Sequence, residues 1–405
     1  MRADRVRVSR NLLEGRMIGL FAVTAAGRAS AAELAIGLGQ DAVVVDGPIR
    51  PALRRLWPQL GAAVFFLATG ATVRLVAELL ADKRSDPGIV CVDEAGRFAV
   101  ALAGGHAGGA NALAERVAEI MGATPVITTA SDATASTPLD ELAESLAAVV
   151  DGDLASCAVA VLDGLPVRIV NPLGFPLPPL PDNVTPGAGS AEWTVVIDDR
   201  LPVRPVAGKT LRLIPRTLIV GIGSARAVPT DAVSNLLARM EPDAGLDLRA
   251  VRAFATIDLK AGERGICEAV QRHEFWTAEA GVALLSYPAA TLSTVEVPNP
   301  SGIVCAEVGT PSVAEAAALH AAAQNSGGGP VELVMPKVKA RNVTMAVARM
   351  RPRGRLAVVG LGPGAAADRT PRADAELRRA SVVVGLESYV DQVRPVLRTG
   401  TEVRT

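Results

Sequence analysis

A loop that places four glycines around one histidine contains the first residue types in the sequence that could do chemistry. It spans residues 102–111, Leu-Ala-Gly-Gly-His-Ala-Gly-Gly-Ala-Asn, between an apolar run and a segment with helical spacing of apolar residues. Glycines let the backbone approach a large ligand closely, and the ordinary pKa of an imidazole suits proton transfer near neutral pH. Because the chain has only three histidines, we interpret His106 as functional. The alternative is a tight turn carrying a packing histidine.

Charged residues further along the chain could bind an anion or act as acids and bases. Asp258 and Lys260 follow an expected strand, and in an extended segment their side chains would share one face. Lys337, Lys339 and Arg341 alternate in the same way and would form a comb of cations suited to a ligand with several carboxylates. A structural ion pair explains the first pattern equally well, and a solvated edge strand protected by lysines explains the second.

The elements that would position the histidine loop alternate between strands and helices. The expected strands are 17–24, 41–45, 62–68, 89–92, 98–102 and 126–128. Glycine loops at 69–72 and 104–109 each lead into an expected helix. Such a pattern predicts an α/β fold with a mostly parallel sheet, in which ligands bind beyond the carboxyl ends of the strands. We expect both loops to open at that edge.

The composition changes after about residue 150. Apolar runs at 158–162 and 167–170 flank Asp163-Gly164, which is a signal for a hairpin. A proline-rich stretch at 172–186 and a short strand at 193–197 follow. We therefore expect a small β-containing domain here, and no motif assigns it any chemistry.

A second α/β unit is predicted from about residue 211. An expected strand at 218–220 leads into a glycine turn at 221–223, whose N–H groups could bind a carboxylate together with Arg226. A dinucleotide fingerprint would need glycine or alanine at position 226, which argues against NAD. A strand at 304–308 and a helix with a Ser312–Glu315 capping box are also expected.

Composition and charge limit the function classes. A chain of 405 residues with 49% apolar and 20% charged residues should fold into two to four domains. A net charge of −1 and an aromatic content of 3% give no electrostatic or stacking case for nucleic acid or an anionic membrane. Four widely spaced cysteines and the lack of a long apolar run favour a cytoplasmic protein without a membrane partner or a metal site.

Several motifs together resemble, in order, those of the cobalt-precorrin-5A hydrolase (CbiG) family. They lie at 104–111, 125–132, 221–223, 257–263 and 308–315, within a match from about residue 18 to 349. The resemblance implies the oxygen-independent branch of cobalamin biosynthesis, with a cobalt-bearing tetrapyrrole as substrate. Its δ-lactone is opened and acetaldehyde leaves, which gives cobalt-precorrin-5B. It also implies two α/β domains joined by a small β-containing middle domain, which we place at 17–150, 211–350 and 151–210 after a flexible 1–16.

The resemblance leaves the catalytic residues open, so their roles are hypotheses. Lactone opening needs an activated water and donors to the oxyanion, and aldehyde release needs an acid and a base. We assign these catalytic roles to His106, Asp132 and Asp258; His106 could instead be an axial ligand of the substrate's cobalt. No cofactor is expected, since the cobalt belongs to the substrate, and other cobalamin-pathway enzymes are candidate partners. The expected substrate contacts are Gly104, Gly105, Gly108, Gly109, Asn111, Thr128, Thr129, Gly221, Gly223, Lys260, Glu263, Lys337, Lys339 and Arg341.

The last residues, 351–405, resemble the opening of a tetrapyrrole methylase, precorrin-3B C(17)-methyltransferase. An expected strand at 355–359 enters Gly360, Gly362, Pro363 and Gly364, and a second strand is expected at 381–385. The resemblance implies S-adenosylmethionine as cofactor only for a complete methylase. Since the chain stops at Thr405, we predict an incomplete C-terminal α/β methylase fragment, from a fusion or a truncated gene product, without methyl transfer.

Two function classes stay open beside the hydrolase. A non-catalytic tetrapyrrole carrier would use the same loops and cations for binding alone, and a methyltransferase would use the C-terminal motif. Acetaldehyde release from cobalt-precorrin-5A separates the hydrolase from the carrier.

Overall fold

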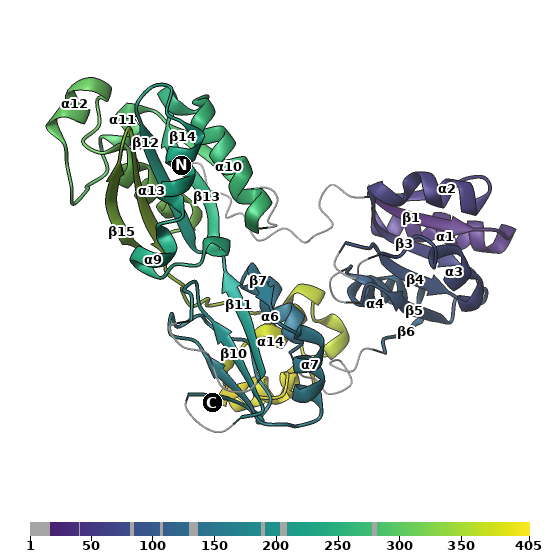
Figure 1. The fold of residues 1–405 in the computed structure, drawn as a ribbon. Helices are drawn as coiled ribbons and strands as arrows, with labels where there is room; N and C mark the ends of the chain where they lie inside the picture. Colours follow the sequence, from purple (N-terminus) through teal and green to yellow (C-terminus); the bar gives the residue numbers. More distant parts are fainter. Residues whose placement is uncertain are drawn as a thin grey trace. The chain divides into compact units, whose positions relative to one another are not determined.

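A computed structural model of the chain describes residues 17–39, 41–81, 85–105, 108–128, 137–187, 191–202, 209–277 and 282–405. The chain forms two compact units, residues 1–134 and 135–405. Figure 1 draws the first unit in purple to blue and the second from blue through green to yellow. Sheets covered by helices confirm the α/β class predicted from the alternating pattern. None of the helices in the described ranges is long and apolar enough to cross a membrane.

The first unit is a six-stranded sheet with helices on both faces. Its strand order is β2-β1-β3-β4-β5-β6. β3 is buried along its whole length, because one apolar cluster covers it with α1 and α4 and another covers it with α2 and α3. The strands are β1 (Met17–Ala22), β2 (Ala42–Val45), β3 (Leu60–Phe66), β4 (Gly88–Val92), β5 (Phe98–Ala103) and β6 (Thr124–Val126). The helices are α1 (Ala25–Leu38), α2 (Ile49–Leu56), α3 (Thr69–Val76) and α4 (Ala110–Met121).

Strand direction changes within this sheet. β3 and β4 are parallel, β4 and β5 are antiparallel, and β5 and β6 are parallel. The reversal follows from the short connection between β4 and β5, in which Gly96 adopts a positive φ and its N–H donates to the carbonyl of Asp93. The loops after β3 and β5 therefore open at opposite edges of the sheet. The expectation that residues 69–72 and 104–109 share an edge was wrong.

The middle sheet begins the second unit and is larger than the sequence suggested. Its order is β7-β11-β10-β8-β9, and the edge strand β7 and its neighbour β11 extend beyond the expected limits of 151–210. Helix α6 packs into the same apolar core. The strands are β7 (Ala148–Asp151), β8 (Val167–Val170), β9 (Val184–Pro186), β10 (Trp193–Ile197) and β11 (Lys209–Pro215). The helices are α6 (Leu139–Ser145) and α7 (Leu154–Leu162).

The hairpin predicted around Asp163-Gly164 was wrong. Its first arm is helix α7, which starts where the carboxylate of Asp153 accepts the N–H of Ser156. Within α7, Cys157, Ala160 and Val161 face the core at helical spacing. The second arm is strand β8, which pairs in parallel with β10 and not with residues 158–162. The first arm therefore follows its helical spacing of apolar residues.

The C-terminal sheet has the order β14-β13-β12-β16-β15, with apolar clusters on both faces. The expected strand at 304–308 is part of helix α12, which Ser301 caps through the N–H of Val304. The strands are β12 (Leu218–Ser224), β13 (Val251–Ile257), β14 (Ala283–Tyr287), β15 (Val331–Ala340) and β16 (Val343–Met350). The helices are α8 (Thr230–Leu237), α9 (Met240–Ala244), α10 (Arg264–Thr277), α11 (Ala289–Leu292), α12 (Gly302–Val308) and α13 (Val313–Asn325).

Gly221 and Gly223 lie within strand β12, so the predicted glycine turn was wrong. A Cβ atom at Gly221 would overlap the carbonyl oxygen of Ala314 in helix α13, and one at Gly223 would lie 2.8 Å from Oγ1 of Thr344. Helix α13 buries a series of alanines against the sheet, which brings the two backbones close together. These glycines are thus required by packing between helix and sheet.

The C-terminal segment contains helices α14 (Pro371–Arg379) and α15 (Glu387–Val393) and a two-stranded parallel sheet of β17 (Val382–Val384) and β18 (Glu402–Arg404). It contacts the middle domain, since the guanidinium of Arg398 binds both carboxylate oxygens of Glu141 at 2.9 and 2.7 Å. The strand expected at 355–359 is absent: these residues have no regular structure, and the side chains of Leu356 and Val358 are 91% and 96% exposed. Among the described strands, none pairs with this segment.

Candidate active site

The glycine loop of the first unit closes on its own backbone. The N–H groups of Ala110 and Asn111 donate to the carbonyls of Gly104 and Gly105, each at 3.0 Å. A Cβ atom at Gly108 would lie 2.9 Å from the backbone nitrogen of Gly88. Gly104, which has a positive φ, and Gly108 are therefore needed for loop closure whatever the loop binds, and two of the first N–H groups of α4 are already used.

Thr128 is another predicted residue that the topology places at the edge of this loop. Thr128 follows β6, which runs parallel to β5, so it lies at the same sheet edge as Gly104. His106, Thr129 and Asp132 lie outside the described residues, and their proposed roles stay predictions.

The second unit gathers charged turns at the carboxyl edge of its C-terminal sheet, where β12, β13 and β14 end in parallel. The turn between β15 and β16 lies at this edge too, because β16 pairs antiparallel with β12 from Val343 onward. The N–H of Ala225 donates to the carbonyl of Asn342 at 2.9 Å, which joins that turn to the turn after β12. Arg226 and Arg341 thus stand in two adjoining turns.

The predicted cation comb is only partly present. β15 contains register shifts between Leu333 and Val338, so its residues do not alternate regularly, and it is an edge strand as the alternative interpretation held. The N–H of Lys337 donates to Glu315 at 3.0 Å, and its ammonium group contacts the carbonyl of Asn299. By contrast, Lys339 and Arg341 are exposed.

The side chains of Lys339 and Arg341 have no hydrogen-bond or ion-pair partner among the described residues, and the same holds for the exposed side chain of Arg226. We define these three residues as the basic edge. Their positive charge is open to a ligand.

Asp258 and Lys260 lie in a short helical turn and not in the predicted extended segment. Asp258–Lys260 is a 3₁₀ turn, so Asp258 and Lys260 do not line one strand face. The Lys260 ammonium pairs with Glu263 at 3.1 Å, and both side chains are only 12–13% exposed. Asp258 is exposed at the end of β13, and its carboxylate accepts the N–H of Leu259 at 2.7 Å. The structural explanation therefore fits Lys260 with Glu263, and Asp258 remains an exposed carboxylate at the edge.

The N-terminal end of α13 differs from the expected capping box. The hydroxyl of Ser312 makes no capping bond. The fully buried Glu315 carboxylate accepts instead from the N–H and side-chain amide of Asn299, at 3.1 and 2.7 Å, and from the N–H of Lys337. Glu315 thus fastens a loop and a strand to the helix, which is why the capping box prediction was wrong.

Three buried hydroxyl groups near the α13 N-terminus were missed by sequence reasoning. The hydroxyls of Ser224, Thr310 and Ser312 have no hydrogen-bond partner within the described ranges. They lie close together, because Val313 follows Ser312 and a Cβ atom at Gly223 would lie 3.2 Å from the Val313 Cβ. The sequence signal was the Thr310-Pro-Ser-x-x-Glu315 stretch, which we interpret from the sequence as a helix start and as part of one of the CbiG-like motifs.

Two family models match the chain in order, one described as Cobalamin synthesis G N-terminal over residues 51–132 and one as Cobalamin synthesis G C-terminus over residues 218–348. The cobalt-precorrin-5A hydrolase of Salmonella typhimurium is 32% identical over 283 residues, which cover 64% of this chain and 80% of that protein. The chain belongs to the cobalt-precorrin-5A hydrolase (CbiG) family. This confirms the resemblance drawn from the ordered motifs.

Further relatives extend over much of the chain. The cobalt-precorrin-5A hydrolase of Priestia megaterium is 26% identical over 326 residues, covering 76% of this chain and 84% of that protein. A solved structure, described as a cobalamin biosynthesis protein G homolog from Sulfolobus solfataricus, is 21% identical and has a TM-score of 0.34; the similarity covers 83% of this chain and 98% of that one. The matched family ranges place the glycine loop, β12 and α13 within CbiG segments.

No group of three or more histidine, cysteine, aspartate and glutamate side chains among the described residues could hold a metal ion. The basic edge supplies three cations, and the exposed carboxylate of Asp258 lies at the same edge of the sheet. Such groups suit recognition of a ligand that carries several carboxylates.

Proposed function

We propose that this chain hydrolyses cobalt-precorrin-5A during cobalamin biosynthesis, opening the δ-lactone and releasing acetaldehyde to give cobalt-precorrin-5B. The observation that carries the proposal is membership of the CbiG family, with both family segments present in order and a named hydrolase covered over 80% of its length. The cobalt belongs to the substrate, and the reaction needs no further cofactor.

The residues of the two units take separate roles in this proposal. Arg226, Lys339 and Arg341 bind peripheral carboxylates of the tetrapyrrole, supported by their exposure and open charge. His106 acts as the general base or acid, since an imidazole can both accept and return a proton near neutral pH. Asp132 and Asp258 are the candidate orienting carboxylates.

The test is acetaldehyde release from cobalt-precorrin-5A by the purified full chain. We expect His106→Ala to lower kcat by about 10²- to 10⁴-fold, the usual contribution of a general acid or base. Substrate affinity should change little, and His106→Gln, which keeps a polar side chain, should be equally slow. His320→Ala is the matched histidine control in the other unit, where His320 packs against the ring of Tyr287. Acetaldehyde release by His106→Ala at the parental rate, with normal substrate binding, would show that the catalytic assignment is wrong.

A non-catalytic carrier is the second candidate, favoured by the open cations of the basic edge and by the structural role of the Lys260–Glu263 pair. In that case the wild-type chain binds the cobalt-tetrapyrrole, seen as a change in its visible absorption, but releases no acetaldehyde. The same assay therefore decides between the two.

We further propose that residues 351–405 are a methylase-like fragment without methyl transfer activity. The support is the irregular backbone at 355–359 and the exposure of Leu356 and Val358, where a methylase strand is expected. Gly360, Gly362, Pro363 and Gly364 lead into a 3₁₀ turn at residues 366–368, and the next helix, α14, begins only at Pro371. Saturable binding of S-adenosylmethionine to the full chain would contradict this.

A reducing, cytoplasmic location completes the proposal, with other cobalamin-pathway enzymes as partners. All four cysteines are free thiols, and burial raises the pKa of the Cys157 thiol to about 11, with the Asp153 carboxylate adding to the effect. A thiol of this kind is largely protonated and unreactive at neutral pH.

A further inference from the structure

A cavity of about 230 Å³ lies between the middle sheet and the C-terminal sheet, on the side away from the basic edge. Its lining includes Asp198, which directly follows β10, and Arg349, which lies next to the end of β16. The lining residues are Pro172, Leu173, Asp198, Arg200, Glu332, Arg349, Arg351 and Pro352. None of them belongs to the site proposed above.

One wall of the cavity is a fixed guanidinium group. Arg349 is only 2% exposed, and its Nε and Nη2 donate to the two carboxylate oxygens of Asp199 at 2.6 and 2.7 Å. Asp199 is fully buried and also accepts the hydroxyl of Thr217 at 2.6 Å. The guanidinium is therefore held in place before any ligand arrives.

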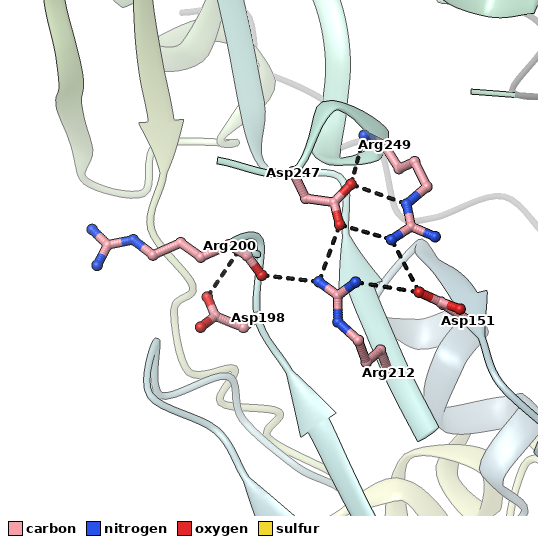
Figure 2. Close-up of polar contacts among 6 residues, drawn as sticks. All are labelled: Asp151, Asp198, Arg200, Arg212, Asp247 and Arg249. Atoms are coloured by element: carbon pink, nitrogen blue, oxygen red, sulfur yellow. Dashed lines mark hydrogen bonds and ion pairs between the residues drawn. The ribbon is translucent and has the colours of Figure 1, made fainter. Parts of the chain in front are cut away.

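Two further arginines border the cavity. Arg351 pairs with Glu332 at 2.7 Å and is 58% exposed. The backbone of Arg200 is hydrogen-bonded. Its N–H donates to the Asp198 carboxylate at 3.3 Å, and its carbonyl accepts from the Arg212 guanidinium at 2.9 Å. Figure 2 shows the Arg200 guanidinium extending away from the neighbouring ion pairs, and no described residue binds it. Its donors are open to a ligand.

An open guanidinium group favours an anion in the cavity. Three guanidinium groups line it together with the carboxylates of Asp198 and Glu332, but Arg349 is paired with Asp199 and Arg351 with Glu332, so the donors left open are those of Arg200. Burial raises the pKa of Asp198, and the neighbouring Asp199 carboxylate raises it further, against smaller opposing effects of Arg200 and Arg349. When Asp198 takes up a proton, the cavity gains net positive charge.

We propose that this cavity binds a carboxylate group, held by Arg200 and Arg351 above the fixed Arg349. Its volume is below the range of about 300–1,000 Å³ that is usual for sites of whole small-molecule ligands, so it suits an acetate- or propionate-sized group and not a macrocycle. The carboxylate belongs either to a free small acid or to a side arm of the tetrapyrrole. The second source rests on the proposed function.

The first experiment titrates the full chain with propionate and, as an uncharged control, with propionamide, by isothermal titration calorimetry. We expect propionate to bind and propionamide not to bind. Arg200→Gln should weaken propionate binding about tenfold, as expected for loss of one charge-assisted hydrogen bond. Arg50→Gln, an exposed arginine of the first unit, is the matched control and should leave binding unchanged.

A pH series separates a specific cavity from general attraction of anions. The charged groups around Asp198 are Asp199, Arg200, Glu332, Arg349 and Arg351, and burial raises the pKa of Asp198. Propionate affinity, calculated for the ionised form, should therefore increase as the pH falls toward the pKa of Asp198. In Asp198→Asn the affinity should be higher at neutral pH and nearly independent of pH.

Equal binding of propionate and propionamide, or unchanged affinity in Arg200→Gln, would overturn the proposal. The KM for cobalt-precorrin-5A then identifies the source: it rises in Arg200→Gln if a tetrapyrrole arm occupies the cavity, and it stays constant if the ligand is a free acid. Absence of acetaldehyde from the wild-type chain would contradict the proposed function only, because the propionate titration does not depend on it.

Discussion

Two groups of charged residues in the second unit lie on opposite edges of the C-terminal sheet and differ in how they are paired. At the junction with the middle sheet, Arg349 pairs with the buried Asp199, and Figure 2 shows Arg212 between the carboxylates of Asp151 and Asp247. At the opposite edge, the basic edge of Arg226, Lys339 and Arg341 is exposed and has no described partner.

The physical reason for the difference is desolvation. A charged group that is buried away from water must be paired. The cations at the junction therefore form ion pairs that hold the two sheets together. Exposed cations need no partner for stability and keep their charge for a ligand. The same reasoning places the Lys260–Glu263 pair with the structural group, although it lies at the ligand edge.

Removing Asp199 should have the largest effect on stability. Asp199→Ala leaves the Arg349 guanidinium buried without its carboxylate, and we expect the free energy of unfolding of the second unit to fall by about 3–5 kcal/mol. Urea denaturation followed by the fluorescence of the buried Trp193 measures it. The double variant Asp199→Leu/Arg349→Met should recover most of the loss, and the exposed Asp258→Ala should change little. A loss of less than about 1 kcal/mol in the free energy of unfolding would show that Asp199 does not belong to the structural group.

Asp247 should show a smaller, pH-dependent effect. Burial alone would raise its pKa, but hydrogen bonds from Arg249 and Arg212 outweigh burial and hold the pKa below its usual value. A lowered pKa in the folded state contributes stability above the unfolded pKa, near 3.9, and this contribution disappears as the pH falls through the folded value. We expect Asp247→Asn to cost about 1–3 kcal/mol at neutral pH.

The pH series compares wild type, Asp247→Asn and the exposed control Asp243→Asn by chemical denaturation. The difference in the free energy of unfolding between wild type and Asp247→Asn should become smaller below about pH 4. If this free-energy difference stays constant across the pH series, the charge-based explanation is contradicted. The substitution would then destabilise the protein through altered packing and not through loss of charge.

The basic edge should affect stability least. Lys339→Ala and Arg341→Ala should each change the free energy of unfolding by less than about 0.5 kcal/mol, because neither side chain has a described partner. Each should weaken cobalt-precorrin-5A binding several-fold at low salt and less at high salt, because exposed charges are screened. Lys337→Ala is the contrasting variant: its ammonium contacts the Asn299 carbonyl, so it should lower stability more than affinity. If Lys339→Ala and Arg341→Ala bind the substrate as tightly as wild type at low salt, the basic edge does not take part in substrate binding.

Local patterns predicted the first unit well and the chemistry at the sheet edges poorly. Apolar period and glycine position placed β1, β3, β4, β5 and α4 to within a few residues. The segment at 154–162 was misassigned because a short apolar run suits a strand or a helix equally, and its environment decided. Gly221 was assigned to a ligand turn, although the close approach of α13 explains it.

The sequence by itself determined the α/β class, the family and which residue types are available for chemistry, since these depend on local spacing and on the order of motifs. Tertiary structure decided which residues meet. The antiparallel β5 sets the edge at which the glycine loop opens, and the Arg349–Asp199 pair joins residues 150 positions apart. Strand direction and burial are properties of the packed sheet. They determine whether a charged side chain is paired within the fold or stays exposed and able to bind a ligand.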